Sequence, residues 1–135
     1  MAVLALAPDR RTAERIHLGF QIVVNYNDGT VRWTETDATL VDVSQVGMFV
    51  RSDRTPRDGQ RILVHVMHNR RGLCAAWGHA VRFDGWGGFG VNFRRINDSL
   101  SGFIGELALA NAYRRSEIME SALDARIWID SSDSE

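Results

Sequence analysis

The segment FQIVVNYNDG at residues 20–29 joins a strand pattern to a turn signal. Apolar and aromatic side chains alternate with other residues along it, at Phe20, Ile22, Val24 and Tyr26. This two-residue period is typical of a half-buried β-strand. The Asn-Asp-Gly sequence that follows favours a tight turn between antiparallel strands. The segment therefore predicts an antiparallel β-hairpin at this place in the chain.

Strand patterns continue on the C-terminal side of this hairpin. Short runs of strand-forming residues follow, at 30–43, 48–51, 62–66, 73–83 and 89–93. Loops that contain proline, glycine or asparagine separate several of them, at 54–59, 69–72 and 84–88. Six or seven short strands joined by turns predict a mainly β fold, an antiparallel barrel that is closed or nearly closed.

The periodicity changes from residue 98 onward. Four apolar residues lie at helical spacing, at Leu100, Phe103, Ile104 and Leu107. Asp98 or Ser99 is available as the N-cap. After a break between 111 and 115, a second amphipathic segment is indicated by Ile118, Met119, Ala122 and Leu123. We expect a C-terminal α-helical segment, one helix or two, over about 98–125. It either covers one end of the barrel or forms a surface for a partner or a second copy.

The composition fits a single domain. A chain of 135 residues buries roughly two thirds of its unfolded surface. The hydrophobic fraction of 44% and the charged fraction of 24% are ordinary for a globular protein. We divide the chain into an N-terminal tail at 1–8, a barrel with its helices at 9–127, and an acidic disordered tail at 128–135.

Charge and cysteine content limit the class of protein. The formal net charge of −1 argues against a general binder of nucleic acids or membrane surfaces, which would carry a basic excess. The single cysteine, Cys74, excludes an intramolecular disulfide and suits a reducing cytoplasm. The apolar start, MAVLALAP at 1–8, is much shorter than the roughly 20 residues of a spanning helix. Membrane insertion is therefore not expected.

Two short motifs, about thirty residues apart, carry the chemistry of a binding site. RRTAER at 10–15 places Arg11 and Arg15 four residues apart, with Arg10 directly before them. DVSQVG at 42–47 spaces a carboxylate, a hydroxyl and a glycine, at Asp42, Ser44 and Gly47. Guanidinium groups can fork onto O6 and N7 of guanine or onto a phosphate, and a carboxylate can accept from guanine N1–H and N2–H. Together the motifs predict a site for a guanine nucleotide.

This combination, RxxxR followed by DxSxxG, resembles the PilZ domain, the bacterial receptor for the second messenger cyclic di-GMP. RIHLGFQIVV at 15–24, MFVR at 48–51 and GGFGVNF at 87–93 are similar to strands of that family. The similarity covers roughly residues 9–110. One departure is Val46, where many members have a second glycine. It adds bulk beside the site but removes no contacting group.

The resemblance implies a barrel that binds cyclic di-GMP through these two motifs. It assigns ligand contacts to Arg11, Arg15, Asp42, Ser44 and Gly47. In the family, an arginine directly before RxxxR accompanies the binding of two stacked ligands, which points to Arg10. A contacting arginine or tryptophan often lies near the position of Arg82. Taken singly, each residue could instead be structural, as a solvated arginine, a strand-end carboxylate, a hydroxyl bonded to local backbone, a glycine at positive φ or half of a cross-strand salt bridge.

A protein of this kind is expected to be a ligand-switched effector in the bacterial cytoplasm, without enzymatic activity and without a cofactor. It would act on an unidentified downstream protein in motility or biofilm regulation, as a monomer or a dimer. Two alternatives stay open: a constitutive protein-interaction module that does not depend on nucleotide, and a small binder of single-stranded nucleic acid. The absence of a basic excess and of an aromatic stripe in the sequence weighs against nucleic acid.

Catalytic and metal sites are not expected. His65 and His68 are three residues apart, which sends them to opposite faces of a strand, and a metal site would need His79 to lie across from His65. The sequence contains no nucleophile elbow, phosphate-binding loop or dinucleotide fingerprint. The four tryptophans are expected in the core or at its rim, at Trp33, Trp77, Trp86 and Trp128.

Overall fold

Strands β2 (Ile16–Asn27) and β3 (Thr34–Ser44) form the antiparallel hairpin that the sequence predicts. The side chains of Ile22 and Val24 are buried, whereas Gln21 before them is exposed and Val23 between them is half-buried. This alternation follows from the two-residue period of a strand. The hairpin therefore contributes one apolar face to the interior of the molecule.

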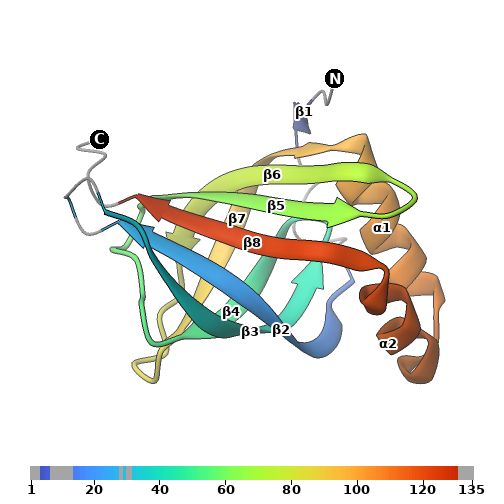
Figure 1. The fold of residues 1–135 in the computed structure, drawn as a ribbon, viewed down its shortest axis with the longest axis horizontal. Coiled ribbons are helices and arrows are strands. Elements are labelled where there is room, and N and C mark those ends of the chain that lie inside the picture. Colours follow the sequence, from blue (N-terminus) through green and yellow to red (C-terminus); the bar gives the residue numbers. More distant parts are fainter. Residues whose placement is uncertain (1–3, 7–13, 28, 30–31, 131–135) are drawn as a thin grey trace.

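The computed structural model describes residues 4–6, 14–27, 29 and 32–130. Within these ranges, seven strands form a closed barrel, and two helices lie at one of its ends (Figure 1). Besides the hairpin, the barrel strands are β4 (Gly47–Ser52), β5 (Arg61–His68), β6 (Gly72–Val81), β7 (Gly88–Asn97) and β8 (Ala122–Asp130). Their order is β7, β4, β3, β2, β8, β5, β6, and β6 pairs again with β7. The predicted β-barrel is confirmed.

Strand β8 closes the barrel, and the sequence patterns did not predict it. It pairs in parallel with β2 and antiparallel with β5, whereas the other pairs around the ring are antiparallel. Ile127 and Ile129 point inward and are 1% and 0% exposed. The expected helix to about residue 125 and the expected tail from residue 128 are therefore wrong over 122–130, where the chain is a strand.

A short strand, β1 (Leu4–Leu6), lies within the stretch expected to be an N-terminal tail. It pairs antiparallel with residues 95–97, at the C-terminal end of β7. Because β7 also pairs with β4 and β6, β1 extends the sheet without being part of the closed ring.

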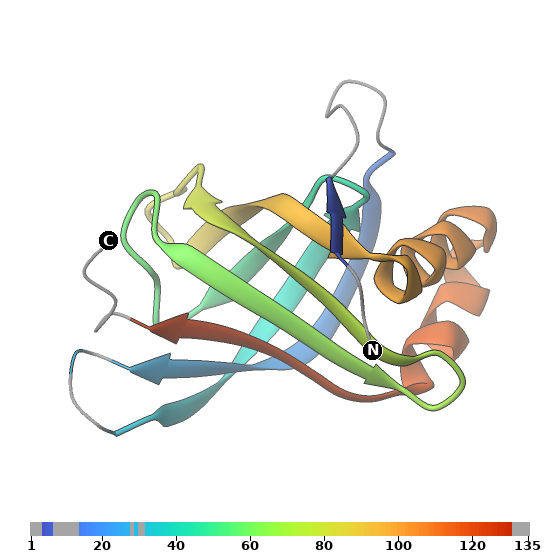
Figure 2. The ribbon, with the colours of Figure 1, turned by 90° about the horizontal axis from the view of Figure 1, so that it is seen from above.

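Helix α1 (Asp98–Leu109) covers one end of the barrel (Figure 2). Its buried side chains are the four predicted ones, and they join the barrel core: Leu100, Phe103, Ile104 and Leu107. The N-cap is Asn97, not Asp98 or Ser99, because the Asn97 side chain accepts the N–H of Leu100 at 2.9 Å. The expectation that a C-terminal helix covers one end of the barrel is thus confirmed for α1.

Helix α2 (Ala112–Glu120) follows after a break at 110–111. Ile118 and Met119 are its buried residues and pack against the same core. Across the described residues, none of the helices is both long enough and apolar enough to cross a membrane.

Candidate functional site

Asp42 faces the outside of the barrel because strand β3 contains a bulge. Leu40 pairs with Val50, and both side chains are buried in the core. The next registered pair is Asp42 with Phe49, so two residues of β3 match a single step of β4. Residues two apart in a regular strand share a face, and the extra residue therefore turns Asp42 away from the face that Leu40 occupies.

Arg15 forms an ion pair with Asp42. Its Nη1 lies 2.9 Å from Asp42 Oδ1, and the two side chains are 36% and 12% exposed. Residues that are 27 positions apart in the sequence thus bring the two motifs together at the start of β2. The other two arginines of the first motif, Arg10 and Arg11, lie outside the described residues.

Ser44 ends β3 and shapes the short turn to β4. Its hydroxyl accepts the N–H of Val46 at 3.2 Å and donates to the carbonyl oxygen of Gly47 at 3.5 Å. Gln45, at the tip of the turn, exchanges two hydrogen bonds of 2.9 Å each with Ser101 of α1. The local backbone bonding that the sequence left open for Ser44 is therefore present, and the turn is tied to the helix.

Any side chain at Gly47 would collide with strand β7. A Cβ built there would overlap the carbonyl oxygen of Val91, and the φ of Gly47 is not positive. Packing against β7 is thus the reason for a glycine here, not the positive φ that the sequence also allowed. Val46, which stands where many relatives have glycine, is buried, and its carbonyl oxygen accepts the N–H of Phe93 at 2.8 Å.

Arg82 follows β6 directly and has a φ of 54°. This left-handed conformation is uncommon for a residue with a side chain. A Cβ built on Gly90 would lie 3.7 Å from the Cβ of Arg82, and Gly90 pairs with Phe49, the partner of Asp42. Arg82, Gly90, Phe49 and Asp42 are therefore successive neighbours in one row that runs across the strands.

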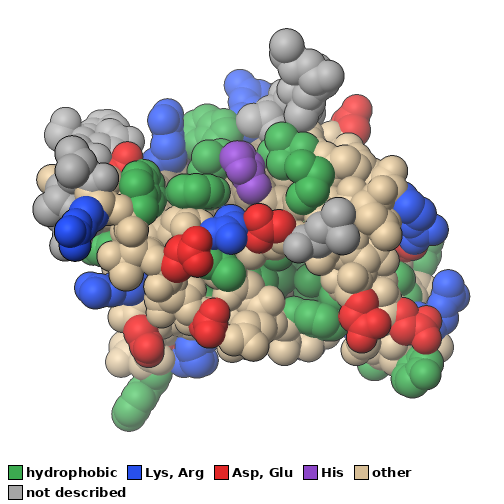
Figure 3. Space-filling model, in the orientation of Figure 1, with side chains coloured by type: hydrophobic (Ala, Val, Ile, Leu, Met, Phe, Trp, Pro, Cys, Tyr) green, Lys and Arg blue, Asp and Glu red, His purple; other side chains and the backbone are tan. Residues whose placement is uncertain are grey.

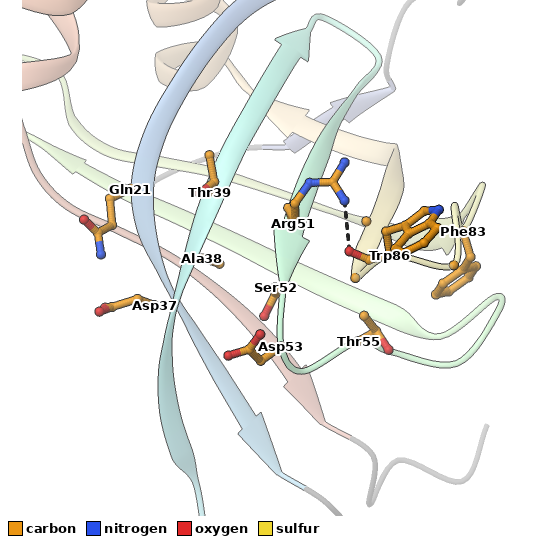
Figure 4. A pocket seen from close by; sticks show the side chains of 13 residues that line it. Gln21, Asp37, Ala38, Thr39, Arg51, Ser52, Asp53, Thr55, Phe83 and Trp86 are labelled. Atoms are coloured by element: carbon orange, nitrogen blue, oxygen red, sulfur yellow. Dashed lines mark hydrogen bonds between the residues drawn. The ribbon is translucent and has the colours of Figure 1, made fainter.

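A hollow of about 710 Å³ opens beside strands β2, β3 and β4 and the loop 82–87, which joins β6 to β7 (Figure 4). In this view, Asp37 lies at one side and Trp86 at the other, with Arg51 and Asp53 between them. Its lining combines carboxylates, a guanidinium, hydroxyls and two aromatic rings, those of Phe83 and Trp86. This is a set of groups suited to hold a polar, flat ligand.

Sequence patterns singled out neither Arg51 nor Trp86 as site residues. Arg51 donates from Nη1 to the carbonyl oxygen of Trp86 at 2.9 Å and from Nη2 to Asp84 at 3.1 Å. Trp86 is 83% exposed, so the expectation that it lies in the core or at its rim is wrong. The available signal was its position between two glycines in a predicted turn, Gly85 and Gly87.

The described residues hold no group of three or more His, Cys, Asp or Glu side chains that could bind a metal ion. Cys74 is buried, and burial raises the pKa of its thiol, so the protonated form is favoured at neutral pH. By contrast, the side chains around Asp42 and Arg51 on the outer face can donate and accept hydrogen bonds, which suits them to binding a ligand.

Comparison with known proteins bears on the same part of the chain. Neither a curated protein nor a solved structure matches it. The family model for the PilZ domain matches residues 9–109, a range that includes both motifs, strands β2 to β7 and helix α1, and that ends before α2 and β8. By this match over most of its length, the chain belongs to the PilZ domain family.

Proposed function

We propose that this protein binds cyclic di-GMP through its RxxxR and DxSxxG motifs and acts as a ligand-switched effector on a downstream protein in the bacterial cytoplasm. The observation that carries the proposal is the ion pair between Arg15 and Asp42 on the outer face of the barrel. It joins the two motifs at one place, where a single ligand can contact both. Membership of the PilZ family supports it, since PilZ domains are generally modules that bind this nucleotide.

Asp42 and Arg15 offer complementary groups to a guanylate. The carboxylate can accept from guanine N1–H and N2–H, while the guanidinium donates to O6 and N7 or to a phosphate. Each charge-assisted hydrogen bond contributes roughly 1.5–3 kcal/mol. Separating the existing ion pair and ordering the side chains costs part of that gain, so the observed affinity lies below the sum of the contacts.

The remaining motif residues have supporting roles in this proposal. Arg11 acts with Arg15 on the same ligand, because the RxxxR spacing joins them in the sequence. Arg10 supplies a further guanidinium for the phosphates of a second, stacked ligand. Ser44 and Gly47 hold the turn beneath the ligand, and Arg82 approaches from the end of β6.

Ligand binding can influence α1 through the turn of the DxSxxG motif. Gln45 lies between Ser44 and Gly47 and is bonded to Ser101 of that helix. A ligand that alters the turn therefore alters the hydrogen bonds that hold α1 in place. We assign the end of the barrel that carries the helices to the downstream protein. A population shift of this kind requires that the ligand favours one arrangement over the other.

Isothermal titration calorimetry of the full chain with cyclic di-GMP tests the proposal. Arg15→Ala and Asp42→Asn should each weaken binding about ten- to a hundred-fold, the equivalent of roughly 1–3 kcal/mol. Arg70→Ala is the matched control, because the Arg70 side chain is 70% exposed and follows β5, three strands away from β3 around the ring. It should bind like the wild type.

The number of cyclic di-GMP molecules bound per chain and the affinities of the variants decide between the possible outcomes. About two ligands per chain would support the role of Arg10, and about one would count against it. Wild-type affinity in a folded Arg15→Ala variant would contradict the assigned site. A folded wild type that binds no cyclic di-GMP would overturn the proposal in favour of a constitutive interaction module that does not depend on nucleotide.

A further inference from the structure

The loop between β6 and β7 holds an exposed tryptophan in a defined position. Asp84 Oδ1 accepts the N–H of Trp86 at 2.7 Å and that of Gly88 at 2.9 Å, and the N–H of Asp84 donates to the carbonyl oxygen of Gly88 at 3.1 Å. The N–H of Trp86, then that of Gly88 and the guanidinium of Arg51, lower the pKa of Asp84. The loop is thus internally bonded, yet it leaves Trp86 83% exposed. An indole in water forgoes the stabilisation that burial of an aromatic ring provides.

Arg51 is fixed beside this tryptophan. Its two hydrogen bonds run to the carbonyl oxygen of Trp86 and to the carboxylate of Asp84, and its side chain remains 47% exposed. A guanidinium has five N–H donors in one plane. Arg51 can therefore hold the loop and still donate to a ligand in the hollow.

The chemistry of the hollow fits a guanine base better than a free anion. Its walls carry two carboxylates, Asp37 and Asp53, against the single guanidinium of Arg51, which disfavours a lone phosphate. Guanine presents acceptors at O6 and N7 to a guanidinium, and donors at N1 and N2 to a carboxylate. Trp86 adds a flat surface for stacking. The volume of about 710 Å³ falls within the roughly 300–1,000 Å³ of small-molecule sites.

The hollow continues the face on which Asp42 lies. Phe49 of β4 pairs with Asp42, and Arg51 follows two residues later on the same strand. The row across the sheet that contains Asp42 and Phe49 is therefore about 7 Å from the row that contains Arg51. On β7, the outward positions beside Phe49 and Arg51 are Gly90 and Gly88, which carry no side chain. The Phe49 ring lies against Gly88 and provides an apolar floor between the two rows.

We propose that this hollow is a second guanine subsite, in which a base stacks on Trp86 and its edge is bonded by Arg51 and by the carboxylates of Asp37 and Asp53. The inference rests on the proposed function, because the same cyclic dinucleotide is held at Arg15 and Asp42 and reaches the hollow with its other base. The subsite gives the protein a preference for a ligand with two guanines.

Titration of full-length variants with cyclic di-GMP tests the subsite. Trp86→Ala should lower the affinity about five- to a hundred-fold, the effect of removing one stack between a base and an aromatic ring. Trp86→Phe keeps a ring and should recover most of the loss. Trp33→Ala is the matched control, because Trp33 is also exposed, at 43%, and lies outside the hollow. Since Trp86 is exposed, the alanine variant should unfold at the wild-type temperature.

A mixed ligand tests which base the hollow selects. The wild type should bind 3′,3′-cyclic GMP–AMP at least about ten-fold more weakly than cyclic di-GMP, and a variant with Asp37→Asn and Asp53→Asn should narrow that difference. Unchanged cyclic di-GMP affinity in Trp86→Ala, together with lost binding in Arg15→Ala, would overturn the subsite and leave the proposed function standing. A folded wild type that binds no cyclic di-GMP would overturn both.

Discussion

At the scale of single residues, His68 holds the turn between β5 and β6 with one ring nitrogen. Its Nδ1 accepts the N–H groups of Arg70 and Arg71 at 3.1 and 3.2 Å, and the ring packs edge-on against Phe103 of α1 with a centroid distance of 5.0 Å. A nitrogen that accepts hydrogen bonds is unprotonated, so the fold requires neutral His68. Burial, followed by the charges of Arg71 and Arg70, lowers its pKa, and Glu106 opposes this shift.

Because of His68, we expect the free energy of unfolding to decrease as the pH is lowered below about 6.5. Its folded-state pKa lies below the ordinary value of 6.5, so the unfolded chain binds the proton first. The stabilisation is complete above pH 6.5 and is lost as the pH falls through the folded-state pKa. One proton accounts for a slope of at most about 1.4 kcal/mol per pH unit. Urea unfolding over this range should show less of this slope in His68→Gln than in the wild type.

The control for this experiment is His17→Gln, because His17 is an exposed histidine on β2. It should keep the wild-type dependence of stability on pH. If His68→Gln also keeps the full dependence, then a different group is responsible for it.

Single residues also show how far the binding site can be predicted from the sequence. The DxSxxG spacing identifies Asp42 and Ser44 as neighbours on one face, since residues two apart in a strand share a face. That this face is the outer one depends on the bulge after Leu40, which the spacing does not reveal. Arg51 and Trp86 were missed because the fold brings them together: Arg51 lies on β4, and Trp86 lies in the loop between β6 and β7, 35 residues further along the chain.

At the scale of elements, α1 is joined to the barrel from two sides. Gln45 and Ser101 bond it to the turn between β3 and β4. At its N-terminus, the Asn97 side chain caps the helix, accepts the N–H of Ala75 at 3.0 Å and donates to the carbonyl oxygen of Leu73 at 2.9 Å. Because Asn97 is only 2% exposed, these bonds are shielded from water.

Loss of the Asn97 side chain should therefore cost more than loss of an ordinary helix cap. Asn97→Ala removes the cap and leaves the buried N–H of Ala75 in β6 without its partner, so we expect the free energy of unfolding to fall by about 2–3 kcal/mol. The matched control is Asn111→Ala, which removes the exposed cap of α2, a bond to the N–H of Arg114, and should cost about 1 kcal/mol or less. Equal losses in urea unfolding would show that the bonds of Asn97 to β6 add nothing.

The elements also differ in how well the sequence predicts them. Strands β2 to β7 were predicted because a two-residue period and clear turn signals mark most of them. Strand β8 was missed because four residues that lead into it also fit a helical period: Ile118, Met119, Ala122 and Leu123. The alternation of Ile127 and Ile129 with Arg126 and Trp128 was present. Its partner β2 lies about a hundred residues away in the sequence, and no local pattern reports a parallel pair of that separation.

At the scale of the whole molecule, acidic and basic side chains are interspersed over the face shown in Figure 3. The formal net charge is −1. Among the described residues, Arg126 of β8 forms ion pairs of 2.9 Å with Glu35 and Asp124. A long polyanion binds best to a continuous field of positive charge, which alternating charges do not provide. The face in Figure 3 is therefore poorly suited to a polyanion, and the small net charge of the chain agrees with this.

Closure of the barrel also depends on the whole chain. Strand β8 fills the gap between β2 and β5, and it lies outside the region 9–109 that the PilZ domain model matches. Without β8, both neighbouring strands would present unpaired edges, which favour aggregation. The matched region of this protein is therefore not expected to form a closed barrel alone.

A chain truncated after Ser121 tests this dependence, and we expect it to lose cooperative urea unfolding and to aggregate. Ile129→Ala keeps the strand but opens a cavity at a fully buried position, so it should remain cooperative while losing about 2–5 kcal/mol of unfolding free energy. Leu109→Ala, at a residue that is 91% exposed, is the control and should change stability by no more than about 0.5 kcal/mol. A truncated chain that unfolds cooperatively at the wild-type midpoint would mean that the remaining strands close the barrel without β8, and that the matched region is a complete domain after all.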